Sequence, residues 1–109
     1  MTSSAEPAMS AADLQQLCAG TDHVSVNACR IYILGVTQGI TVGMNMAGGK
    51  GRTARPCVPP GVSAQELGQT VKAKLDQRLS ASSADLNLDA AAFIGTVLTE
   101  TFRCPRAAQ

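Results

Sequence analysis

Apolar residues recur at helical spacing in several stretches of the chain, and the first stretch has a clear start. Ser10-Ala11-Ala12-Asp13 is a capping box, in which the serine hydroxyl and the carboxylate each satisfy a free backbone amide. Met9 and Leu14 stand where a hydrophobic staple would flank this cap. The pattern predicts a helix over 10–18 that is stopped by Gly20.

A second, longer helix is predicted from about Ser25 to about Met44. Two sets of apolar residues repeat at steps of three and four, so that two of its faces are apolar. A helix that is apolar on most sides is usually central in its fold, and we expect this position here. The first set is Val26, Cys29, Ile33, Val36, Ile40 and Met44, and the second is Ile31, Leu34 and Val42.

The same stretch carries Gly35, Gly39 and Gly43 at four-residue spacing. Each glycine destabilises a helix interior by about 1 kcal/mol relative to alanine. We therefore expect that another element packs closely against these glycines. We expect that neighbour within the same chain, and a dimerisation seam is the alternative.

The second half of the chain predicts two more helices. Ser63-Ala64-Gln65-Glu66 is another capping box, with Val62 and Leu67 as its staple. A serine-rich loop over 80–85 should separate this amphipathic helix from a last one, from about Asn87 to Phe102. The expected buried positions are Leu67, Val71, Leu75 and Leu79 in the third helix, and Leu86, Ala90, Phe93, Ile94, Val97, Leu98, Thr101 and Phe102 in the fourth.

These segments predict an all-α fold, a small four-helix bundle-like domain over residues 10–104. No stretch shows the alternation of a β-strand. Residues 1–9 are small and polar and are expected to be disordered, and residues 105–109 form a tail. The chain has 109 residues, enough for one core. Its formal net charge of +1 argues against a nucleic-acid binder, and no apolar run is long enough to span a membrane.

The four cysteines, Cys18, Cys29, Cys57 and Cys104, include no C-x-x-C pair. An even set in so small a domain predicts two disulfides and an oxidising compartment. Zinc fits poorly, because the gaps are long and His23 is the only histidine, and buried free thiols are the other alternative. Three connectivities are possible, and the sequence cannot separate them.

We favour Cys18–Cys29, which would staple two successive helices, and Cys57–Cys104, which would tie the second half of the chain together. If the cysteines are oxidised, we expect that a signal peptide preceded this sequence and has been removed, because residues 1–9 do not resemble one.

The sequence shows no catalytic constellation. His23 falls in the loop that a Cys18–Cys29 bridge would close, where an exposed histidine without a catalytic role is expected. The carboxylates are scattered singly, and several sit where they cap helices. We therefore expect no enzyme activity, no cofactor and no metal.

The order of the motifs resembles the Rap/Tai family of periplasmic immunity proteins, over roughly Leu14 to Cys104. The shared residues are Cys18, Cys29, Tyr32, Ile33, Gly35, Cys57, Val58, Pro59, Gly61, Val62, Ser63, Leu67, Val71, Phe102 and Cys104. The chain departs from the family in having Phe-Arg-Cys at its last motif and no His-Pro step before the last helix. The resemblance implies a disulfide-stapled helical protein that binds and blocks a peptidoglycan amidase delivered by type VI secretion, often as a homodimer.

Two segments are candidates for contacting such an amidase. Ser80, Ser82 and Ser83 could hydrogen-bond within a narrow catalytic cleft, and we favour this segment. The glycine-rich stretch with Lys50, Arg52 and Arg55 could meet an acidic rim, although a solvated connection is the simpler interpretation. The alternative function is a small periplasmic helical binding protein or stress chaperone without a toxin partner.

Overall fold

The computed structural model of the chain describes residues 9–46 and 56–104. These contain four α-helices, α1 (Ala11–Ala19), α2 (His23–Met46), α3 (Ala64–Ala81) and α4 (Ala90–Thr101), and a 3-10 helix, η1 (Ser83–Asn87). The described residues form no strand, only two isolated bridges. The all-α prediction is confirmed. Residues 1–8, which belong to the segment expected to be disordered, and the tail 105–109 lie outside the described residues.

Both predicted capping boxes are present. In α1, the Asp13 amide donates to Ser10 Oγ at 3.1 Å, and the Ser10 amide donates to Asp13 Oδ2 at 3.2 Å. In α3, Ser63 and Glu66 make the same reciprocal pair, with both bonds at 3.1 Å. These local interactions are encoded within four residues, which explains why the sequence places both helix starts correctly.

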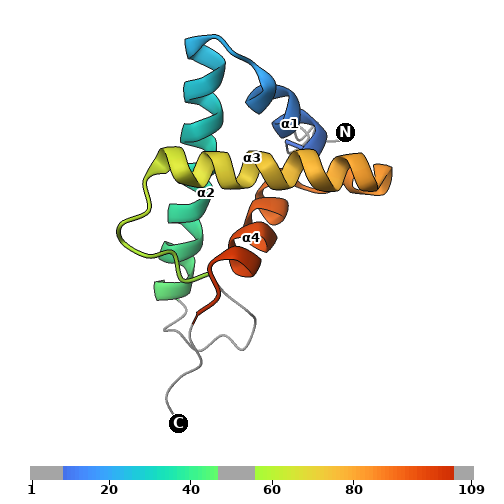
Figure 1. Cartoon of the computed structure of the whole chain (residues 1–109). Helices are drawn as coiled ribbons and strands as arrows, with labels where there is room; N and C mark the ends of the chain where they lie inside the picture. Colours follow the sequence, from blue (N-terminus) through green and yellow to red (C-terminus); the bar gives the residue numbers. More distant parts are fainter. Residues whose placement is uncertain (1–8, 47–55, 105–109) are drawn as a thin grey trace, which may run out of the picture.

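Helix α2 contacts α1, α3 and α4, but each of the four α-helices contacts the other three. Only Cys29, Ile33 and Thr37 of α2 are buried, so the expectation that its second apolar face, with Ile31 and Val42, is covered in a central helix is wrong. Figure 1 shows α3 lying across α2 and α4, with α1 packed beside the first half of α2. The core between them is aliphatic around a single buried ring, Phe93. Its buried members are Ala11, Leu14, Cys18, Cys29, Ile33, Leu67, Val71, Leu75, Leu79, Ala90, Phe93, Ile94, Val97 and Leu98.

Two helix starts differ from the predicted ones. Helix α2 begins at His23 because the Asp22 carboxylate accepts a hydrogen bond from the Ser25 amide at 3.1 Å. Helix α4 begins at Ala90, after Asp89, whose side chain accepts from the Ala92 amide. The Ala90 amide donates to the Met9 carbonyl at 2.8 Å, which holds the start of α4 against the start of α1.

Three predictions about individual segments are wrong. The expected loop over 80–85 is the last turn of α3 followed by η1. Thr101 is exposed, not buried, because it lies in the last turn of α4. The glycine stripe has no close neighbour among residues 9–46 and 56–104, since a Cβ added at Gly35, Gly39 or Gly43 would meet no atom of another element there within 4 Å.

The favoured disulfide pairing is confirmed. Cys18–Cys29 joins α1 to α2 across a sequence separation of 11, with the Cα atoms 5.0 Å apart. Cys57–Cys104 closes a separation of 47, with the Cα atoms 4.8 Å apart. Beside this second bridge the Cys57 amide donates to the Phe102 carbonyl at 2.7 Å, so the entry to α3 is fixed to the exit of α4.

Candidate functional site

The described residues hold no free thiol and no group of side chains that could bind a metal ion. All four cysteines form disulfides, which removes the zinc and free-thiol alternatives and leaves His23 without a thiol to activate. His23 is exposed in the first turn of α2 and not in a loop. Within the described ranges, no group of three or more His, Cys, Asp or Glu side chains could hold a metal ion.

The structure brings the favoured serines together at one corner, residues 80–83, which we call the serine corner. Ser80 Oγ donates to the Asp76 carbonyl, four residues earlier in α3, at 2.7 Å. Ser82 follows the last residue of α3, and its amide donates to the Arg78 carbonyl at 3.0 Å. Ser83 starts η1, and its side chain lies outside the described part of the structure. Figure 1 shows this end of α3 extending past the other helices.

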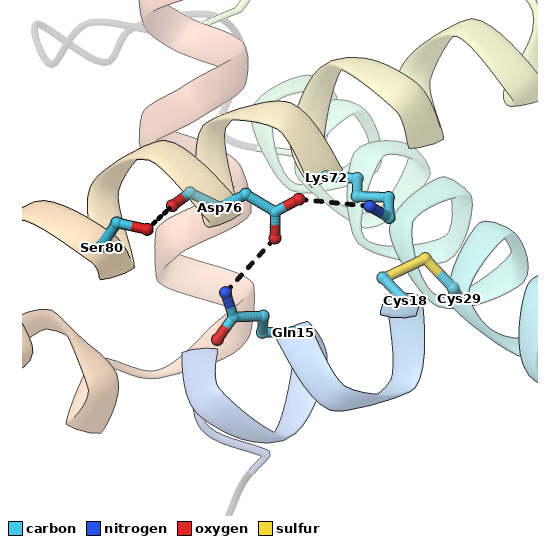
Figure 2. A network of polar contacts seen from close by, with 6 residues as sticks. All are labelled: Gln15, Cys18, Cys29, Lys72, Asp76 and Ser80. Carbon is cyan, nitrogen blue, oxygen red and sulfur yellow. Dashed lines mark hydrogen bonds and ion pairs between the residues drawn. A yellow bond between two sulfur atoms is a disulfide. The ribbon is translucent and has the colours of Figure 1, made fainter. Parts of the chain in front are cut away.

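The α3 helix leading to the serine corner is tied to α1 by Asp76 (Figure 2). Gln15 Nε2 of α1 donates to Asp76 Oδ1 at 3.3 Å, and Lys72 Nζ contacts Asp76 Oδ2 at 3.2 Å. The hydrogen bond from Gln15, and then the one from Lys72, lowers the pKa of Asp76 below its ordinary value. The pair is half-exposed, so its electrostatic contribution to stability is small.

A second contact ties the same end of α3 to α4. The Arg78 guanidinium hydrogen-bonds to Glu100 Oε1, and it also lies over the Phe93 ring, 6.0 Å from the centroid. The hydrogen bond to Arg78 lowers the pKa of Glu100. Asp76 and Arg78 together hold the last turns of α3 against two neighbouring helices, so the serine corner stands on a fixed support.

One side of α2 is apolar and faces away from the core. Val24, Ile31, Val42 and Met46 are 77%, 66%, 55% and 83% exposed. They share this side with the exposed Gly35, Gly39 and Gly43, and we call these seven residues the open face of α2. The sequence marked Ile31 and Val42 as apolar but gave no reason to leave them uncovered, and it did not single out Val24 or Met46.

The basic candidates Lys50, Arg52 and Arg55 lie outside the described residues. Sequence reasoning also missed the roles of Arg78 and Gln15. Their partners, Glu100 and Asp76, are 22 and 61 residues away, so no local pattern could have shown these contacts.

No helix in the described ranges is long and apolar enough to cross a membrane. No curated protein and no solved structure matches the chain. A family model, that of the Rap1a immunity proteins, matches residues 10–104, which include all four helices and both disulfides. The chain therefore belongs to the Rap1a immunity protein family.

Proposed function

We propose that this protein is an immunity protein that binds a peptidoglycan amidase delivered by type VI secretion and occludes its active site in the periplasm. Membership of the Rap1a immunity family is the observation that carries the proposal. The two disulfides support a site of action outside the cytoplasm, because disulfides persist in oxidising compartments. The protein acts by binding and not by catalysis.

The serine corner is the segment that we propose enters the amidase cleft. It lies at the end of a helix that extends past its neighbours, and Gln15–Asp76 and Arg78–Glu100 fix that helix in place. A fixed, protruding group loses little conformational entropy on binding, which favours tight inhibition. Lys50, Arg52 and Arg55 would add attraction to an acidic rim and raise the association rate.

The open face of α2 supports a homodimer as the state in which the inhibitor works. Its apolar residues are more than half exposed, and its glycines would let a second helix approach closely. The same exposure also favours the alternative function, a stress chaperone that covers the apolar surface of unfolded proteins. Suppression of aggregation without any effector binding would support that alternative.

A periplasmic rescue assay tests the immunity proposal. A candidate amidase, such as the product of an adjacent gene that encodes one, is expressed in the periplasm with and without the protein, and lysis is followed. We expect that co-expression prevents lysis. Lysis that continues at equal expression of a folded protein would exclude that amidase as the partner.

The role of the serine corner is tested in the same assay by Ala81→Trp. Ala81 is exposed within the corner, so a large side chain there should block entry to a narrow cleft without disturbing the core. Ala73→Trp is the matched control, because Ala73 is an exposed alanine of the same helix outside the corner. Equal rescue by both variants would move the contact to another surface.

A further inference from the structure

A groove runs between the first half of α3 and the corner where α1 meets α2. Its volume is about 400 Å³, which is within the range of ligand-binding clefts. It lies at the opposite end of α3 from the serine corner. Gly68 and Ser82 are separated by 14 residues, which corresponds to about 20 Å at the rise of an α-helix.

The groove is open because α3 has a residue without a side chain at this point. Gly68 has no side chain, and a Cβ built there would meet nothing within 4 Å. Its neighbours along this wall are Gln65, Gln69 and Lys72, in contrast to the buried apolar stripe on the inner side of α3. The sequence therefore leaves open space beside Gly68 that a larger side chain at this position would enter.

The floor of the groove is apolar and rigid. The Cys18–Cys29 disulfide and Val26 line it from α1 and α2. Figure 2 shows this disulfide near Lys72, and the Gln15–Asp76 contact joins α1 to α3 one turn away along α1. An apolar floor of this kind is suited to a small aliphatic side chain.

The charge of the groove has one sign. Arg30 and Lys72 line it, and no carboxylate does. Lys72 contacts Asp76, which stands outside the lining, whereas Arg30 makes no ion pair with any residue of the described ranges. A cation without a counter-ion beside an apolar floor attracts a group that carries an anion next to an apolar surface.

We propose that this groove binds an extended acidic segment of a partner protein. A carboxylate of the segment would lie between Arg30 and Lys72, and an adjacent small aliphatic side chain would lie on the Cys18–Cys29 disulfide. Gln65 and Gln69 both donate and accept hydrogen bonds, as a peptide backbone requires. This binding site is separate from the serine corner and does not depend on the identity of the effector.

The test uses the full oxidised protein and a fluorescein-labelled peptide, Ala-Val-Asp-Leu-Glu-Val, with its Asn/Gln counterpart as a neutral probe. Fluorescence anisotropy is measured up to about 1 mM protein, so that a Kd as weak as about 1 mM is detected. We expect saturable binding of the acidic peptide that weakens with salt, and about tenfold weaker binding of the neutral one. Equal binding of both peptides, or no binding of either, would overturn the proposal.

Gly68→Leu tests whether the peptide binds in the groove. The added side chain fills open space on a helix, so the protein should stay folded by circular dichroism while peptide binding is lost. Ala73→Leu, on the same helix but outside the groove, should bind like the parent. Arg30→Gln should weaken binding several-fold, and Lys74→Gln, which changes a charge outside the lining, should not. Retained binding by Gly68→Leu would contradict the assignment.

Discussion

The glycines that the structure describes differ in how much space a Cβ would have, and Gly20 has the least. A Cβ at Gly20 would lie 2.5 Å from Ser25 Cβ and 2.8 Å from Ser25 Oγ, whereas its backbone, with φ of −65°, suits any residue. We expect Gly20→Ala to lower the free energy of unfolding by about 1–3 kcal/mol, the usual cost of overpacking. Urea denaturation measures this, with Gly68→Ala as the control that should be stabilised by up to about 1 kcal/mol. Equal stability of both variants would show that Ser25 moves freely.

Asp76 gives a prediction about pH. Its pKa is lower in the folded protein than in the unfolded chain, so its contribution to stability is present above the unfolded pKa of about 3.9. This contribution is lost as the pH falls through the folded pKa. We expect Asp76→Asn to cost roughly 0.3–0.5 kcal/mol at pH 7, because the pair is exposed, and nothing at the lowest pH. The pKa values of Asp22 and Glu100 are also lowered, but both groups are present in the parent and in the variant. Their contributions to the pH dependence therefore cancel when the two proteins are compared. A difference that persisted below pH 2 would exclude this linkage.

At the scale of the elements, the capping boxes predict how much each helix start contributes. Ser63 satisfies the Glu66 amide at the start of α3, whose inner stripe is fully buried. Ser63→Ala should therefore lower the free energy of unfolding by about 1 kcal/mol, and Ser63→Asp should restore most of it. Thermal or urea unfolding of the three proteins provides the measurement. A loss that Asp does not restore would point to packing rather than to capping.

A comparison of the predicted and observed helices shows which features the sequence could predict. Interactions within four residues, such as both capping boxes and the stripe from Leu67 to Leu79, were predicted correctly because they depend on local chemistry. The start of α2 was missed although its cap, Asp22 with Ser25, is local, whereas other helix bounds depend on distant segments. The start of α4 is held by Met9, 81 residues earlier in the chain, and the end of α3 is held by Glu100. The serines were found by composition, but the expected loop did not show that Ser80 lies in α3, where its Oγ donates to the Asp76 carbonyl.

For the molecule as a whole, the two disulfides should differ in their contribution to stability. Cys18–Cys29 closes a separation of 11 residues and Cys57–Cys104 one of 47. Chain entropy then predicts losses of about 3 and about 4 kcal/mol for the respective double alanine variants. Urea denaturation under non-reducing conditions compares them. Removal of the first bridge should also abolish acidic-peptide binding in the groove, while removal of the second should leave it. The reverse pattern would contradict the role assigned to the Cys18–Cys29 floor.

The last prediction concerns the oligomeric state of the protein and is based on the open face of α2. Four of its seven residues are exposed aliphatic side chains on one side of one helix, opposite the buried Cys29 and Ile33. A second copy of the chain would bury this surface and bring the glycines of both helices together. We expect the protein to sediment as a dimer, with twice the 11.2 kDa mass of the chain.

Two variants test this dimer by sedimentation velocity. Ile31→Lys with Val42→Lys should give a monomer, because two charges would be buried without partners. Gly39→Leu should stay folded, since a Cβ built there would meet no neighbouring element of the described structure within 4 Å, and it should weaken the dimer if the two α2 helices meet there. Gln16→Lys with Gln77→Lys adds the same charge at exposed positions of α1 and α3 and should leave the dimer intact. A wild-type monomer, or a dimer that survives both α2 variants, would remove this face as the interface and leave its exposed residues to a partner of another kind.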